Sequence, residues 1–160
     1  MSQLSLSPIS QDYLVENLFS LAIMQKTNST KIVLQALSNQ IDTAHLPSIV
    51  DQLQRHLPSV LLTTCFNDEN LPFLVEVKKT EIGHLFEHIL LDYLCQLKIA
   101  KGYNSAVFSG RTRWNWIKEP RGKFHIRLNC GTKDADIFPL AIEKTIALMK
   151  TLLLLQLQKS

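Results

Sequence analysis

The feature that most constrains the fold is a long apolar stripe between Gly83 and about Lys101. Gly102 follows the stripe and is suited to end a helix. A helix of this kind has to bury its apolar face, so the rest of the chain must supply an apolar surface of similar length. The stripe has the three- and four-residue spacing of one helix face: Leu85, Phe86, Ile89, Leu90, Tyr93, Leu94 and Leu97.

Strands are predicted on both sides of this helix. Residues 123–130 alternate between apolar side chains (Phe124, Ile126, Leu128) and polar ones (Lys123, His125, Arg127), which is typical of a half-buried strand. Residues 105–114 form the strand before it. Two more strands, at 59–66 and 72–79, are predicted from their apolar and β-branched residues and from the turn residues "NDEN" between them.

Helices are predicted at 10–25, at 45–56, where "LP" ends the segment, and at 134–158. The segment 28–40 can be either a strand or a helix. The order is therefore a helical N-terminal part followed by β-β-α-β-β-α. This order indicates an α+β fold with an antiparallel sheet of about four or more strands and helices on one face. We expect one domain over residues 1–160, in which residues 1–44 form a helical extension.

The apolar stripe of the last helix is broader than one core face requires. Either deep burial within the domain or a contact between copies of the chain would explain it, so a homo-oligomer stays open. The stripe consists of Ile146, Leu148, Met149, Leu152, Leu153 and Leu155.

Composition indicates a soluble cytoplasmic protein. At 160 residues with 46% hydrophobic residues, the chain can bury a core of ordinary size. It has no signal-peptide pattern and no uncharged apolar run of about 18 to 20 residues that could span a membrane. Three widely spaced cysteines, Cys65, Cys95 and Cys130, argue against a disulfide framework and suit a reducing compartment.

Positive charge is concentrated between Lys98 and Lys133, where nine Lys or Arg residues stand against one acid, Glu119. The segment is either a surface for anionic partners or an ordinary solvated face. Nucleic-acid binding, with Trp114, Trp116 and Phe124 as stacking groups, is the least favoured interpretation, because strand alternation turns Phe124 towards the core.

The predicted long helix carries the motif H-x-x-E-H. His84 and His88 are one turn apart on the same face, where two imidazoles can share a metal ion, and Glu87 is close enough to act on a water molecule at that ion. This order of residues is the signature of the inverzincins. The alternative is a polar helix face that carries two histidines by chance.

A catalytic zinc ion needs a third protein ligand and an open position for water. Cys65 closes the first strand of the predicted hairpin that leads into the helix, so it can lie near the helix start, although it could equally be a buried structural cysteine. A thiolate ligand would favour zinc over manganese or iron. The candidates are Cys65, Cys130, Glu119, Asp134, Asp136 and Glu143.

Several stretches, in the same order, resemble the N-terminal domain of cyanophycin synthetase. They are "LPSIVDQLQRHLP", "TTCFNDENLPF", "EIGHLFEHILLDYLCQL", "VFSGRTR" and "KFHIRLN", and together they cover about residues 45–130, with a looser match to the last helix. The resemblance implies a cytoplasmic α/β module. In some members it is a metallopeptidase-like site that cuts cyanophycin, a polyaspartate with arginine on each side chain; in others it only helps to hold the polymer.

Residue by residue, the resemblance implies His84, His88 and Cys65 as metal ligands and Glu87 as the general base. It places Arg111 and Arg113 at the arginines of the family's G-R-T-R. The sequence departs from the family between Cys65 and Phe73, which is short and lacks glycine, and it contains no counterpart of the polymerising domains of the synthetase.

The expected function is therefore that of a zinc-dependent hydrolase acting on cyanophycin or a related Asp/Arg peptide. Arg111 and Arg113, two positions apart on a strand, point to the same side and could hold carboxylates of such a peptide, or they could be ordinary surface arginines. The alternative is a non-catalytic protein that binds cyanophycin or assists a synthetase.

Overall fold

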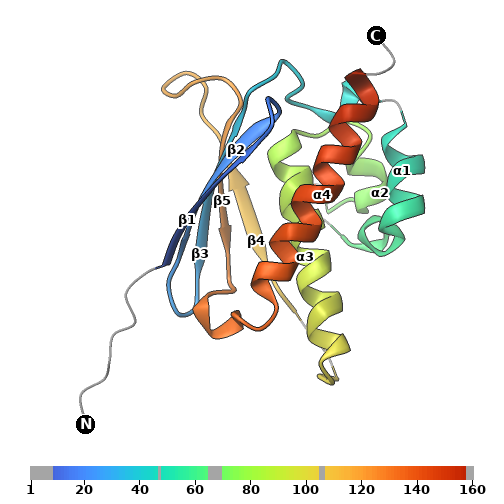
Figure 1. Ribbon diagram of the computed structural model, residues 1–160. Helices are drawn as coiled ribbons and strands as arrows, with labels where there is room; N and C mark the ends of the chain where they lie inside the picture. Colours follow the sequence, from blue (N-terminus) through green and yellow to red (C-terminus); the bar gives the residue numbers. More distant parts are fainter. Residues whose placement is uncertain (1–8, 47, 65–69, 105–106, 158–160) are drawn as a thin grey trace.

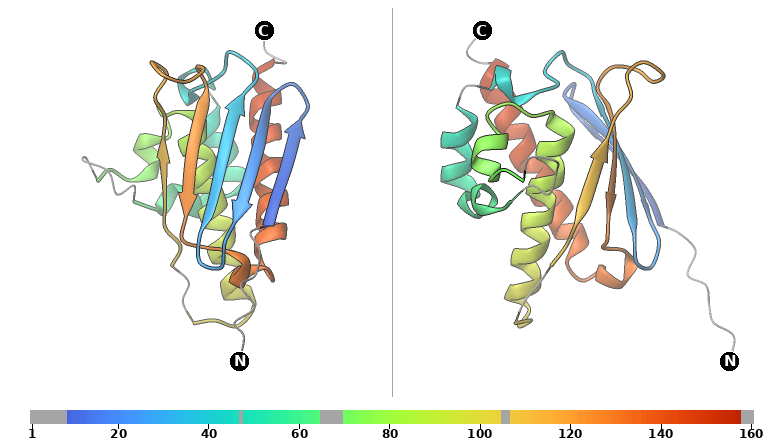
Figure 2. Two further views of the ribbon diagram at one scale, coloured as in Figure 1. Left: turned by 90° about the vertical axis from the view of Figure 1, so that its left-hand side faces the viewer. Right: turned by 180° about the vertical axis from the view of Figure 1, so that it is seen from behind.

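The computed structural model describes residues 9–46, 48–64, 70–104 and 107–157. Its strands form one five-stranded antiparallel sheet in the order β1-β2-β3-β5-β4, and the helices pack on one face of that sheet (Figures 1 and 2). The predicted α+β class with helices on one face is confirmed. The strands are β1 (Ile9–Val15), β2 (Phe19–Gln25), β3 (Thr30–Ala36), β4 (Gly110–Arg113) and β5 (Lys123–Leu128).

Two long helices, α3 and α4, lie against the sheet, and shorter helices cover their outer side (Figure 1). The predicted helix at 83–101 is confirmed as α3, and the helices predicted at 45–56 and 134–158 correspond to α1 and α4. The helices are α1 (Ile49–His56), α2 (Phe73–Glu76), α3 (Ile82–Ala100) and α4 (Phe138–Leu157), with 3-10 turns η1 (Thr43–His45), η2 (Pro58–Leu62) and η3 (Thr132–Asp134).

The prediction of a helical N-terminal part is wrong, because the described chain begins with three strands. In β2 every second residue is buried, including Phe19, Leu21 and Ile23, which is the alternation of a strand that covers a core. A tight turn with Glu16 at a positive φ of 48° reverses the chain between β1 and β2. Since β3 lies in the middle of the sheet, the first 44 residues supply part of the core and are not an extension.

The hairpin predicted at 59–66 and 72–79 is also wrong in its described residues; residues 65–69 lie outside them. The first segment forms η2, which starts at Pro58 and buries two consecutive side chains, Val60 and Leu61. The second forms α2, where Phe73 and Val77, four residues apart, are both fully buried. That spacing is helical, and burial of this one face outweighed the strand propensity of the β-branched residues.

The core lies between the sheet and the helices α3 and α4. Gly83 in the first turn of α3 lies directly against the ring of Phe124 on β5, so that a side chain there would overlap the ring. The absence of a side chain therefore lets the start of α3 approach the sheet closely. In α4 the side chains of Leu148, Met149 and Leu152 are buried, so the broad apolar stripe is used largely within the domain.

None of the described helices combines the length and the apolar character needed to cross a membrane.

Candidate functional site

The predicted site residues His84, Glu87 and His88 lie in the first two turns of α3, which contact Phe73 of α2 on one side and Thr112 of the edge strand β4 on the other. Glu87 and His88 are buried, with 5% and 8% of their surfaces exposed, while His84 is half-buried. The close packing of Gly83 on β5 brings this end of α3 next to the sheet. Polar side chains at such depth need specific partners.

The two histidines face each other. Their Nε2 atoms lie 3.0 Å apart, and their rings are nearly perpendicular, at 82°. Two nitrogen ligands of one tetrahedral zinc ion lie about 3.3 Å apart, because each is about 2.0–2.1 Å from the metal. The side chains are therefore arranged with two nitrogens at nearly the spacing that one metal ion requires.

Neighbouring residues fix the orientation of both rings. Thr80 Oγ1 lies 2.7 Å from His84 Nδ1, so the second ring nitrogen of His84 already has a hydrogen-bond partner. The ring of Phe73 from α2 stacks on His88, with centroids 4.0 Å apart and planes 11° from parallel. A hydrogen bond to the second nitrogen is what orients a metal-binding imidazole and selects its tautomer.

Burial lowers the pKa of both histidines. For His88, burial and then the neighbouring His84 lower the pKa to about 3. For His84, burial lowers the pKa despite the opposing charges of Glu76 and Glu81. Both rings are neutral at pH 7 as a result, which is the form in which imidazole binds a metal.

Glu87 points towards β4. Thr112 Oγ1 donates a hydrogen bond of 2.6 Å to Glu87 Oε1, and a Cβ atom at Gly110 would lie 3.2 Å from Glu87 Cγ. Burial raises the pKa of Glu87 to about 6, although the Thr112 hydrogen bond acts in the opposite direction. A carboxylate with such a pKa is ionised at pH 7 and basic enough to take up a proton during a reaction.

A third metal ligand is not found in the part of the chain that the structure describes, because no three His, Cys, Asp or Glu residues cluster there. Cys65 lies outside that part. Thr64, the residue before it, pairs with Pro72, which adjoins the Phe73 that stacks on His88. The described chain next to Cys65 therefore lies close to the two histidines.

The other candidates for the third ligand have roles elsewhere. Glu119 accepts hydrogen bonds from His125 and pairs with Lys123, and Asp134 Oδ2 accepts a hydrogen bond from the Gly131 N–H. Cys130 is buried against Thr30, while Asp136 pairs with Lys101. These four residues and Glu143 form no cluster with the histidines that could hold a metal ion, as far as the described residues go.

Arg111 and Arg113 do share one side of a strand, as predicted, but it is the side away from the histidines. In the pairing of β4 with β5, Arg111 is opposite Arg127 and Arg113 is opposite His125, whereas Thr112 is opposite the buried Ile126. Residues directly opposite each other share a face. Thr112 therefore faces the helices and Glu87, while the two arginines lie on the outer, solvent-exposed face of the sheet.

The aromatic residues of the β4–β5 hairpin form a packed cluster. Phe124 is fully buried, and the rings of Trp114 and Trp116 meet it edge to face at centroid distances of 5.7 and 5.6 Å. The Trp116 indole N–H donates a hydrogen bond to the Lys123 carbonyl. Phe124 therefore lies in the core, as the strand alternation predicts, whereas Trp114 keeps 39% of its surface exposed.

The sequence matches the family model for the cyanophycin synthase-like N-terminal domain over residues 31–152. The chain belongs to this family. No curated protein matches the sequence closely enough to be named as a relative. The match to the cyanophycin synthase-like N-terminal domain begins inside β3 and ends inside α4, so β1 and β2 lie outside it.

Three residues of this cyanophycin synthase-like domain were missed by sequence reasoning: Thr80, Thr112 and Phe73. Thr80 could have been found, because it is four positions before His84. Thr112 could have been found as the residue between two arginines, since neighbours on a strand face opposite sides. Phe73 gave no signal, because its contact with His88 depends on the tertiary packing of α2 on α3.

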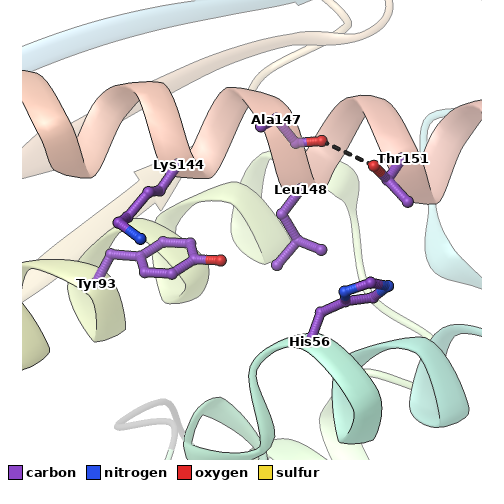
Figure 3. Close-up of a pocket in the computed structure, with 6 residues that line it drawn as sticks. All are labelled: His56, Tyr93, Lys144, Ala147, Leu148 and Thr151. Atoms are coloured by element: carbon purple, nitrogen blue, oxygen red, sulfur yellow. Dashed lines mark hydrogen bonds between the residues drawn. The ribbon is translucent and has the colours of Figure 1, made fainter.

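A separate hollow of about 240 Å³ lies between α1, α3 and α4 (Figure 3). In it, Lys144 Nζ lies 5.7 Å from the centre of the Tyr93 ring. None of its lining residues belongs to the histidine cluster. The lining consists of His56, Tyr93, Lys144, Ala147, Leu148 and Thr151.

Proposed function

We propose that the domain is a metal-dependent peptidase in which His84 and His88 hold one divalent metal ion, with zinc as the favoured ion. The observation that carries the proposal is the convergence of the two Nε2 atoms to 3.0 Å, in rings that are neutral and fixed by Thr80 and Phe73. These groups fit two of the three ligands of a catalytic zinc ion. Cys65 stays the predicted third ligand.

In the proposed site the protein has to hold both imidazoles with their Nε2 lone pairs towards the ion. His84 does so when its Nδ1–H donates to Thr80 Oγ1, and His88 when its proton is on Nδ1. When bound, the ion would polarise the scissile carbonyl and acidify a water molecule. The hydrogen bond between the two histidines is given up on binding, since both nitrogens then act as ligands.

Glu87 is the proposed general base. Its pKa of about 6 leaves it ionised at neutral pH, so that it can accept a proton from the attacking water and return it to the leaving amine. Thr112 holds one carboxylate oxygen and leaves the other free to take the proton. The proposed substrate is cyanophycin or a related Asp/Arg peptide, on the basis of family membership.

The first test is the metal content of the untagged protein, measured by elemental mass spectrometry beside the double variant His84→Ala/His88→Ala. We expect one equivalent of zinc in the wild type and none in the variant. Hydrolysis of insoluble cyanophycin, with and without a chelator, then tests turnover. Glu87→Gln should retain the metal and lose activity; a metal-loaded Glu87→Gln variant that still cuts the polymer would refute the role of Glu87.

A non-catalytic accessory function is the second candidate. It is favoured by one observation: Arg111 and Arg113 lie on the outer face of the sheet, where they could bind a polymer away from the two histidines. In that case the protein would bind cyanophycin without cutting it. Absence of metal even after zinc is supplied, together with retained binding of the polymer, would make this the better explanation.

A further inference from the structure

β4 forms one edge of the sheet and is exposed along its length apart from Thr112, which is half-buried (Figure 2, left). Within the described chain its strand partner is β5 alone. The Asn129 N–H donates to the Ser109 carbonyl, and hydrogen-bonded pairs alternate along an antiparallel ladder. The backbone groups of Arg111 and Arg113 therefore face β5, while those of Gly110 and Thr112 face outwards from the edge.

This free edge adjoins the candidate site. Glu87 is hydrogen-bonded to Thr112 and packs closely against Gly110, so the two residues with outward-facing backbone groups are the ones that contact Glu87. An extended peptide added to this edge would run past Glu87, with its backbone about 4.8 Å from that of β4.

The outer face beside the edge is strongly basic. Arg111, Arg127 and Lys31 lie in one cross-strand row, and Arg113 lies in the next. Like charges directly opposite each other destabilise a sheet. None of these four cations forms an ion pair within the described residues. Glu119, the acid of the β4–β5 hairpin, pairs instead with Lys123 and His125. An anionic ligand on this face would relieve the repulsion.

We propose that the domain binds an extended acidic peptide as an added antiparallel strand on the free edge of β4. Gly110 and Thr112 pair with its backbone, and Arg111 and Arg113 bind carboxylates two residues apart. The residues opposite the arginines form non-hydrogen-bonded pairs, in which side chains approach most closely. The carboxylates lie on the outer face, and the residue between them faces Glu87. The strand pairing and the arginine contacts do not depend on the proposed function. Only the catalytic meaning of placing a peptide residue beside Glu87 rests on it.

The test uses a fluorescein-labelled peptide with aspartate at every second position and threonine between. Binding to the full chain is followed by fluorescence anisotropy, with a chelator present so that the peptide is not cut. N-methylation of the threonine amides, which would face β4, should weaken binding by about ten-fold or more, because it removes the backbone hydrogen bonds. N-methylation of the aspartate amides, which would point away, should have little effect.

Arginine variants test the charge contacts. The double variant Arg111→Gln/Arg113→Gln should lose about ten-fold or more in affinity, because charge-assisted hydrogen bonds are lost. Arg127→Gln is the matched control: it removes a charge from the same face, one strand further from the edge, and should change affinity by less than about three-fold. Equal effects of both methylation patterns, an effect of Arg127→Gln as large as that of the double variant, or no binding would each overturn the proposal.

The experiments distinguish failure of the proposed peptidase function from failure of the proposed peptide binding. A protein without metal or hydrolytic activity could still show the methylation pattern and the arginine dependence. Conversely, a zinc-dependent peptidase that is indifferent to both would retain the function and exclude this mode of peptide binding.

Discussion

The hydrogen bond between Thr112 and Glu87 gives a prediction that can be made quantitative. Thr112→Val keeps the shape of the side chain and removes the donor that lies 2.6 Å from Glu87 Oε1. Because the pKa of Glu87 is raised by burial to about 6, its contribution to stability is fully present below pH 4.5 and is lost as the pH rises through 6. In the wild type this loss is about 2 kcal/mol, from a difference of 1.5 between the two pKa values.

As the pH rises, the Thr112→Val variant should lose more folding stability than the wild type does, and it should do so over a wider pH range. A hydrogen bond to a charged group contributes about 1.5–3 kcal/mol, so its removal should raise the folded-state pKa of Glu87 further above its value in the wild type. The difference in unfolding free energy between wild type and Thr112→Val should therefore grow by about 1.5–3 kcal/mol from pH 5 to pH 8.5. His84 and His88 also titrate, but they are common to both proteins and largely cancel in the difference.

Urea unfolding followed by circular dichroism, on metal-free protein at several pH values, measures this difference. Thr145→Val is the matched control: its buried hydroxyl donates to the Ala141 carbonyl and has no ionisable partner, so the effect of that substitution should not depend on pH. If Thr112→Val and Thr145→Val are equally independent of pH, the reasoning about Glu87 is refuted.

Three further predictions follow from contacts in the core and at the site. Gly83→Ala should lower the free energy of unfolding by at least about 1–3 kcal/mol in urea titrations, because the new methyl group overlaps the Phe124 ring; an unchanged midpoint would show that α3 can shift freely. Phe73→Leu should weaken zinc binding in a chelator competition, because the ring that stacks on His88 is lost; equal affinity would mean that this ring does not orient the ligand. Cys130 should resist iodoacetamide at pH 8, because burial raises its pKa to about 11, and should be labelled in urea; mass-spectrometric mapping of labelled native protein checks this.

The parts of the site that could be predicted are those set by local spacing. His84 and His88 are one helical turn apart in any helix, so their common face followed from the sequence. The distance of 3.0 Å between their Nε2 atoms could not be predicted from the sequence, because it depends on side-chain rotamers that Thr80 and Phe73 fix. The common side of Arg111 and Arg113 was predictable from the strand period, but which side it would be depends on the pairing of β4 with β5.

The fold was predictable where one period dominates, as in α3, α4 and β5. The N-terminal segment contains both periods: Tyr13, Leu14, Leu18 and Leu21 match a helix, whereas Phe19, Leu21 and Ile23 alternate as in a strand. The reversal at Glu16, which separates two strands of seven residues, decides between them and carries no glycine or proline to mark it. At 59–62, burial against α1 and α3 outweighs local propensity, and at 73–77 packing against η2 has the same effect.

The position of β3 has a consequence for how the chain folds. The meander β1–β3 and the hairpin β4–β5 are each built from neighbouring segments, so both can form early and independently. They are joined by the pairing of β3 with β5, in which Gln35 meets a residue about 90 positions further along the chain. Closing that loop is entropically expensive before the helices pack, so we expect this junction to limit the folding rate. During synthesis, one edge of β3 therefore stays unpaired until the chain has been made as far as residue 128.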